Sequence, residues 1–242
     1  MASCCMLLRS ERRLVLRQGA LVGAILLSGL ASPVQALDVS SLSRADATAG
    51  VKAALERGSA AAVASLGAPD GFLGNPKVRI PLPAGLQHAE PVMRLMGRQQ
   101  EFDDLVVGIN RAAEAAVPHA KPLLLSAIRA MTLADAKAII TGGDDSVTAF
   151  FRSKSEKALA AKFLPVVRHT TDKVGLARQY NSLAGQAASF GAIKAEDARI
   201  EGYVTRQALS GLFLMIAEQE RAIRRDPAGT GSAILRRVFG AG

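Results

Sequence analysis

Residues 102–116 of the chain, FDDLVVGINRAAEAA, are the stretch that decides its fold class. Their apolar positions recur three or four residues apart, which is the period of one face of an α-helix. The positions concerned are Phe102, Leu105, Val106, Ile109, Ala112, Ala113 and Ala116. The stretch therefore predicts an amphipathic helix whose apolar stripe faces a core.

The composition extends this prediction to the whole chain of 242 residues. The sequence contains 44 alanines, 49% hydrophobic residues and only 4% aromatic residues. Because alanine is the strongest helix former, such a chain favours helices, and its length suits one domain or a small pair. We expect residues 37–242 to form a single all-α domain, a bundle of about eight helices.

Local sequence signals place the ends of several of these helices. Thr132 and Asp135 form a capping-box pair. One helix is expected to end at Thr141-Gly142-Gly143, where a glycine can take the left-handed conformation, and Asp144 is expected to cap the next one. Prolines interrupt the helical period over 69–83, which predicts a short extended segment there and no sheet. Later helical patterns cover about 176–190 and 209–226, and an apolar tail follows at 234–239.

The first 36 residues have the three parts of a secretory signal peptide. Four arginines precede an uncharged, largely apolar stretch, and small residues stand just before the predicted cleavage between Ala36 and Leu37. A membrane anchor is the alternative, but a span needs about 20 apolar residues and this run is shorter. We therefore expect a periplasmic or secreted protein whose mature part has no transmembrane segment.

The export route is left open by the residues around one arginine pair. Arg12 and Arg13 precede apolar residues and a further basic residue, as in the twin-arginine motif. Glu11 and Val15 depart from that motif, so general secretory export is the alternative.

Motifs that carry chemistry are scarce in the predicted mature part. Both cysteines, Cys4 and Cys5, fall within the signal peptide, so cleavage would leave no disulfide and no thiol nucleophile. Cleavage would also lower the net charge from +9 to +6. The three histidines are widely spaced, and neither a phosphate-binding loop nor a nucleophile elbow occurs. We therefore predict no catalytic residue, no metal and no cofactor.

A few polar residues are still candidates for a ligand site. Asn110 and Glu114 lie four residues apart on the helix predicted over 102–116, so they share a face, and Arg111 stands between them. One interpretation is a structural contact to a neighbouring element, and the other is a polar pocket. The speculative ligand-binding residues are Asn110, Arg111, Glu114, Asp144, Asp145, Arg152 and Tyr180. The two adjacent aspartates lack the spacing of an EF-hand, and helix capping accounts for the first of them.

Two basic clusters mark the second half of the chain. One spans residues 152–178, and the other contains Arg221, Arg224 and Arg225. Such clusters favour acidic partners. For an exported protein, lipid phosphates are closer than nucleic acid, and we expect no nucleic-acid binding. The alternative is an ordinary solvated helix face.

Several segments occur together in a specific order. They are PDGFL (69–73), VRIPLP (78–83), NRAAE (110–114), TGGDD (141–145), FFR (150–152), QYN (179–181), YVT (203–205), GLFLMIAE (211–218) and IRRDP (223–227). This order resembles the bacterial family of exported proteins called domain of unknown function 4197, over residues 42–240. Phe151 departs from the tyrosine that is usual in the family. The resemblance implies a single exported helical domain, and it implies no activity and no catalytic residues.

Three classes of function are compatible with these features. The preferred one is a non-catalytic binding or interaction protein of the cell envelope, which takes an apolar ligand or a protein partner. The second is an enzyme with an Arg/Glu/Asp site, and the third is a peripheral protein on an anionic membrane surface. The first is preferred on three features of the sequence: the predicted exported helical body, the small-residue faces of its helices and the missing catalytic motif. The oligomeric state is not predicted.

Overall fold

The fold is given by a computed structural model, which describes residues 44–88, 90–95, 97–173, 178, 180–181 and 199–226. The chain divides into two units, Met1–Leu37 and Asp38–Gly242, and every described residue belongs to the second unit. The predicted signal peptide, its arginine pair and its cleavage site therefore lie outside the described residues. The apolar tail at 234–239 and most of the helix expected over 176–190 also lie outside them.

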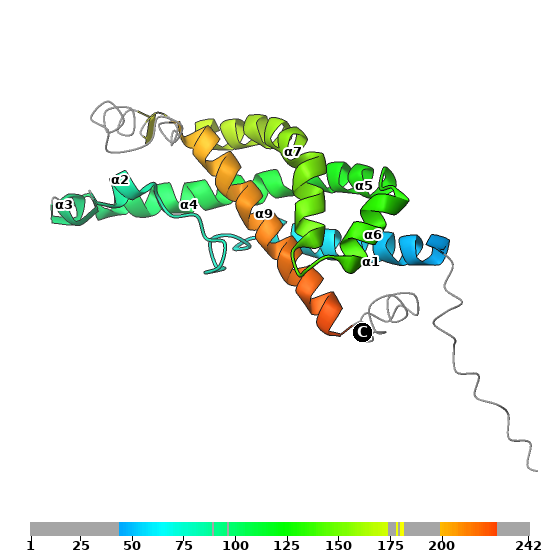
Figure 1. The fold of residues 1–242 in the computed structure, drawn as a ribbon. Coiled ribbons are helices and arrows are strands. Elements are labelled where there is room, and N and C mark those ends of the chain that lie inside the picture. Colours follow the sequence, from blue (N-terminus) through cyan, green and yellow to red (C-terminus); the bar gives the residue numbers. More distant parts are fainter. Residues whose placement is uncertain are drawn as a thin grey trace, which may run out of the picture. The chain divides into compact units, whose positions relative to one another are not determined.

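Every regular element in the described part of the chain is a helix, which confirms the all-α fold class (Figure 1). The elements are α1 (Arg44–Gly67), α2 (Ala84–Gln87), α3 (Glu90–Leu95), α4 (Gln99–Ala116), the 3₁₀ helix η2 (Val117–Ala120), α5 (Lys121–Arg129), α6 (Leu133–Thr141), α7 (Ser146–Lys173) and α9 (Ile200–Arg225). None of these helices is long and apolar enough to cross a membrane.

The expected number of about eight bundle helices is wrong. Within the described residues, five helices form the packed body: α1, α4, α5, α7 and α9. The elements α2 and α3 have only four and six residues, which is too short to bury a full apolar face. Helices α5 and α6 both have nine residues, but α5 packs more extensively against α1 and α7 than α6 does, so α5 is counted with the body.

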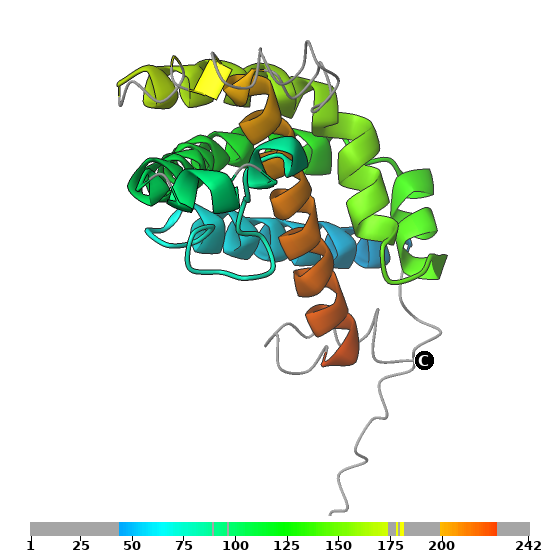
Figure 2. The same cartoon turned by 90° about the vertical axis from the view of Figure 1, so that its left-hand side faces the viewer.

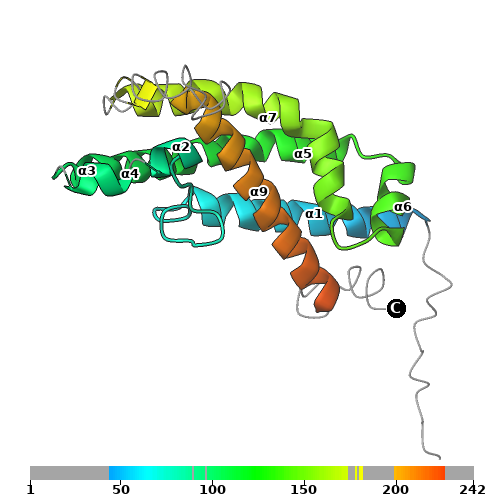
Figure 3. The same cartoon turned by 60° about the vertical axis from the view of Figure 1, so that its left-hand side comes forward.

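Helix α9 is the central element of this body. It crosses α1, α4 and α7 in the views of Figure 1 and Figure 3, and it packs against all three. Val204, Leu212 and Phe213 are buried, as expected for a helix that is surrounded on several sides. Within 212–217, Leu214 is the exposed position.

The predicted apolar stripe of α4 faces the core. Phe102, Leu105 and Ile109 are buried together with Ala112, Ala113 and Ala116, and Val106 is half-buried. The 3.6-residue period therefore predicted both the helix and its buried face.

The two ends of α6 confirm one predicted helix end and correct another. At its start, the Asp135 N–H donates to the Thr132 hydroxyl, and the Thr132 N–H donates to the Asp135 carboxylate, so the capping box is formed. At its other end, Gly143 has no positive φ and Gly142 has φ −82° and ψ 170°, so the left-handed glycine expected there is wrong. A Cβ at position 142 would lie 2.6 Å from both the Ala138 carbonyl oxygen and the Ser146 Cβ. Glycine is therefore required by close approach and not by a positive φ.

Residues 68–83, here called the Pro-rich segment, connect α1 to α2 without a strand. The segment makes turns as far as Val78 and then continues as irregular chain through Pro83. It runs from the end of α1 past α9 to α2 (Figure 2). The prolines remove backbone donors that a sheet would need, which agrees with the short extended segment expected here.

Candidate functional site

Asn110 of α4 binds the Pro-rich segment through a buried carboxamide. Its Oδ1 accepts the N–H of Ile80 at 2.8 Å, and its Nδ2 donates to the carbonyl oxygens of Ile80 at 2.9 Å and Val106 at 2.8 Å. The carboxamide thus pairs with both backbone groups of Ile80, as a neighbouring strand would. Of the two interpretations of Asn110, the geometry fits the structural contact.

Glu114, one turn later on α4, holds the beginning of the same segment. Its Oε1 accepts the backbone N–H groups of Phe72 and Leu73, each at 3.1 Å. Its Oε2 accepts a hydrogen bond from Arg111 at 2.7 Å, and Arg111 also donates to Asp70 at 2.8 Å. These two hydrogen bonds, that to Glu114 first, raise the pKa of Arg111, so its guanidinium stays charged. Both oxygens of Glu114 are occupied by the fold.

Helix α9 fixes the Pro-rich segment from its other side. The Tyr203 hydroxyl donates to the Pro81 carbonyl oxygen at 2.8 Å, and Lys77 forms an exposed ion pair with Glu218 at 2.7 Å. Phe72 is fully buried against Gly211, where an added Cβ would lie 2.8 Å from the ring. The segment is irregular, but it is held at several points along its length.

An open groove of about 450 Å³ lies beside this segment. One wall belongs to the Pro-rich segment, and the other walls belong to α2, α3 and α4. The lining residues are Pro76, Arg79, Pro81, Leu82, Gln87, Glu90, Phe102, Asp103 and Val106. The groove combines apolar surface with cationic and anionic side chains, and its volume lies in the range of ordinary binding sites.

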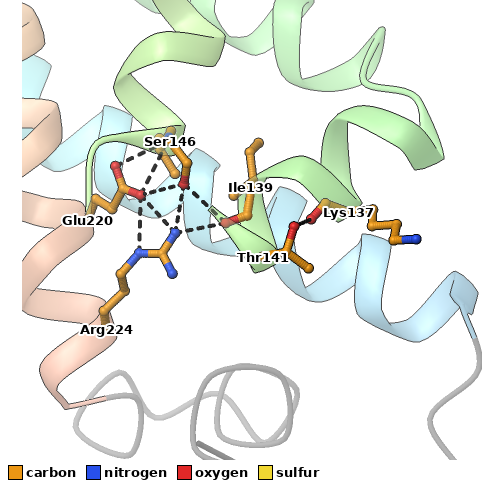
Figure 4. A network of polar contacts seen from close by, with 7 residues as sticks. Lys137, Ile139, Thr141, Ser146, Glu220 and Arg224 are labelled. Atoms are coloured by element: carbon orange, nitrogen blue, oxygen red, sulfur yellow. Dashed lines mark hydrogen bonds and ion pairs between the residues drawn. The ribbon is translucent and has the colours of Figure 1, made fainter. Parts of the chain in front are cut away.

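A second polar network joins α9 to the start of α7 (Figure 4). Both oxygens of Glu220 lie 3.2 Å from the Val147 nitrogen, and Oε1 also accepts from the Ser146 hydroxyl. Arg224 donates to Glu220, to the Ser146 hydroxyl and to the Ile139 carbonyl oxygen at the end of α6. The carboxylate that serves the first turn of α7 is thus Glu220, whereas the sequence pointed to Asp144.

A small apolar pocket borders this second network between α1, α7 and α9. It is lined by Leu55, Gly58, Phe151 and Ile216, with Glu220 at its edge, among other residues. Its volume of about 20 Å³ is close to that of one water molecule. The pocket is therefore a packing defect between helices and not a site for a metabolite.

The remaining ligand-site candidates are divided among other environments. Asp144 and Asp145 are exposed in the turn before α7. Arg152 lies 4.9 Å from the centre of the Phe213 ring and 3.6 Å from Glu156. Tyr180 is fully buried. The structure brings Asn110, Arg111 and Glu114 together around one segment, and it places the other four elsewhere in the fold.

The predicted basic surface at the end of α9 is smaller than the sequence suggested. Arg225 is exposed and Arg221 is half-buried. The Arg224 side chain is only 18% exposed, and its guanidinium is committed to the network with Glu220. Glu220 was not predicted from the sequence, although its spacing of four residues from Arg224 is the pattern of a helical ion pair.

No group of three or more histidine, cysteine or acidic side chains that could hold a metal occurs in the described part of the chain. The fold and these contacts define a class of all-helical domain. In it, buried side chains of α4 hold the Pro-rich segment beside an open groove, and a buried side chain of α9 holds the start of α7. The chain belongs to the family described as Protein of unknown function (DUF4197), whose model matches residues 41–240. No curated protein and no solved structure matches the chain.

Proposed function

We propose that this chain is an exported, non-catalytic binding protein of the cell envelope, and that the groove beside the Pro-rich segment binds a protein partner. The observation that carries the proposal is the combination of this groove with a rigidly held irregular segment of sixteen residues. Connections longer than about 12–15 residues without secondary structure are uncommon and are usually functional.

The way in which the segment is held supports a role in recognition. Asn110, Glu114 and Tyr203 bond to its backbone, which leaves the side chains of Arg79 and Pro76 on the groove side. Binding residues are often carried by loops that a rigid scaffold positions. Since both backbone groups of Ile80 are already paired, recognition would depend on side chains and not on the addition of a strand.

The charges of the groove favour a peptide-like partner over a purely apolar ligand. Arg79 and Asp103 are exposed on opposite walls, and Glu90 adds a second carboxylate that is paired with Arg94. An extended protein segment can offer charges of both signs together with apolar side chains. Of the residues considered for an enzyme, Arg111 and Glu114 are occupied in holding the segment, and Asp144, Asp145, Arg152 and Tyr180 lie elsewhere in the fold. This division favours binding over catalysis.

Export is tested by fractionation of cells that produce the full chain. The expected result is a periplasmic protein whose intact mass lacks residues 1–36. Replacement of Arg12 and Arg13 by lysine should block export if the twin-arginine route operates, and it should have little effect if the general route does. A cytoplasmic protein that retains its first 36 residues would refute the export proposal.

Binding in the groove is tested with a photo-crosslinking amino acid at Val106, which lines the groove. The control carries it at Ala115, an exposed position on the same helix outside the groove lining. We expect a defined product with one envelope protein from position 106 only. The exposed substitutions Arg79→Glu and Asp103→Arg should abolish that product while leaving the helical circular dichroism unchanged. Equal products from both positions, or products that survive both charge reversals, would refute the site.

A further inference from the structure

A second groove, of about 300 Å³, lies between α5 and α7. Leu123, Ser126 and Ala127 of α5 and Ala130 just after it form one wall, and Ala158 of α7 forms part of the other. Ser155 contributes to the floor, but its hydroxyl already donates to the Phe151 carbonyl oxygen at 2.6 Å. The interior of this groove, here called the α5–α7 groove, is therefore mainly apolar.

Several cations belong to the lining of the α5–α7 groove or adjoin its lining residues. Lys154 lines the groove, and Lys157, one turn later on α7, is exposed beside Ala158. From the other wall, Arg129 is exposed next to Ala130, and the Lys52 ammonium of α1 donates to the Arg129 carbonyl oxygen at 3.2 Å.

Lys154 itself is already paired with a carboxylate. The Asp135 carboxylate lies 3.4 Å from the Lys154 ammonium, in an ion pair whose lysine is half exposed. Such a pair contributes little binding energy and can be exchanged for another anion at low cost. The positive charges of Lys154 and Lys157 beside the groove therefore favour an anion.

We propose that the α5–α7 groove binds a monoacyl anion, that is, a molecule with one hydrocarbon chain and a terminal carboxylate. The chain would lie on the alanine and leucine walls, and the carboxylate would lie between Lys154 and Lys157. A volume of about 300 Å³ is at the lower end for ligand sites, which suits a single chain and not a two-chain lipid. This site is separate from the groove beside the Pro-rich segment and does not depend on the proposed function.

The test is calorimetric titration of the purified protein with dodecanoate below its micelle concentration. Two matched ligands separate the parts of the molecule: dodecyltrimethylammonium keeps the chain and reverses the charge, and acetate keeps the carboxylate without the chain. The expected result is binding of dodecanoate, binding of the cationic analogue that is weaker by about tenfold or more, and no heat from acetate.

Two pairs of variants place the site. Ala130→Trp fills the groove, and Ala115→Trp makes the same change at an exposed position of α4. Lys154→Glu with Lys157→Glu reverses two charges at the groove, and Lys162→Glu with Lys173→Glu reverses two exposed charges elsewhere on α7. We expect the groove variants to weaken dodecanoate binding by about tenfold or more and the control variants to change it by less than about twofold.

Several results would overturn the proposal. They are absence of dodecanoate binding, equal binding of the cationic analogue, and equal affinities of the groove and control variants. Light scattering adds a further one: if Ala130→Trp splits a dimer while dodecanoate does not bind, the groove is an interface between two copies of the chain. Circular dichroism of each variant identifies any that fail to fold, and for these Ala127→Leu replaces the tryptophan.

Discussion

Two buried glutamates, Glu114 on α4 and Glu220 on α9, make similar hydrogen bonds in two regions of the molecule. Glu114 accepts the N–H groups of Phe72 and Leu73 in the Pro-rich segment, and Glu220 accepts the N–H of Val147 in the first turn of α7. Each glutamate also pairs with an arginine one turn away on its own helix. Both glutamates are nearly inaccessible to solvent.

The two regions differ in what surrounds the arginine. The Arg111 side chain is 41% exposed and has a second carboxylate, Asp70, within reach. The Arg224 side chain is 18% exposed, and its partners include the neutral Ser146 hydroxyl and the Ile139 carbonyl oxygen. Loss of the glutamate would therefore leave Arg111 with Asp70 and with water, whereas it would remove from the poorly hydrated Arg224 the Glu220 carboxylate that accepts its Nε–H and one of its Nη2 hydrogens. Although the two glutamates make similar hydrogen bonds, we therefore expect their removal to lower the free energy of unfolding by different amounts.

The largest effect is expected for Glu220→Ala. It would leave a mostly buried guanidinium without its carboxylate and the Val147 N–H without its acceptor, at a cost of about 3–5 kcal/mol in the free energy of unfolding. Urea denaturation measures this cost. Glu218→Ala, which removes the exposed partner of Lys77, is the matched control and should cost less than about 1 kcal/mol. Equal costs for the two substitutions would mean that the network around Arg224 is not stabilising.

A smaller effect, about 2–3 kcal/mol, is expected for Glu114→Ala. The N–H groups of Phe72 and Leu73 would lose their acceptor, but Arg111 would keep Asp70 and its contact with water. The change should also be local: amide hydrogen exchange of Phe72 and Leu73 should accelerate more than that of the α9 core. If Glu114→Ala destabilises the protein as much as Glu220→Ala, exposure of the arginine does not explain the difference between the regions.

The two glycines of the α6–α7 turn provide a matched pair for the next effect. Gly142→Ala would place a Cβ 2.6 Å from the Ala138 carbonyl oxygen and should cost about 1–3 kcal/mol. The Cβ of Gly143→Ala would meet only the Asp145 carboxylate, at 3.8 Å, so its effect should be within about 0.5 kcal/mol. Thermal unfolding of both variants measures the difference. A costly Gly143→Ala together with a tolerated Gly142→Ala would contradict the close approach.

Local periodicity predicted the parts of this molecule that depend on neighbours in sequence. The stripe on α4, the capping box of Thr132 with Asp135 and the apolar character of α9 all follow from residues three or four apart. The number of packed helices did not follow, because the Pro-rich segment and the turn at Gly142 leave short helices that cannot bury a full face. The requirement for glycine at position 142 comes from the close approach of Ala138 and Ser146, four residues to either side. The rule that glycine ends a helix in the left-handed conformation did not predict this contact.

The polar contacts show the same limit. Asn110 and Glu114 stood out because they interrupt an apolar helix, but their partners lie 30 to 42 residues away in a segment without periodicity. Glu220 reaches Val147 across 73 positions, and its pairing with Arg224 was hidden among other arginines. Sequence therefore identified side chains that needed partners, and only the fold supplied the partners.

The smallest effect concerns a third carboxylate that accepts a backbone N–H, that of Asp135, whose side chain is partly exposed to water. Hydrogen bonds from the Thr132 backbone and hydroxyl lower the pKa of Asp135 below its ordinary value of 3.8, with a lesser contribution from Lys154. A lowered folded-state pKa stabilises the protein above the unfolded-state pKa, and this stabilisation is lost as the pH falls through the folded-state value. The stability difference between the wild type and Asp135→Asn should therefore be constant from pH 7 to pH 5 and should shrink below about pH 4. Urea denaturation over this pH series measures it, with Thr132→Ala expected to weaken the pH dependence more than Lys154→Ala. If the stability difference between the wild type and Asp135→Asn grows as the pH falls, the direction of the Asp135 pKa shift is contradicted. If Asp135→Asn costs as much stability as Glu220→Ala, burial does not explain why the contacts of Glu114 and Glu220 stabilise the protein more than those of Asp135.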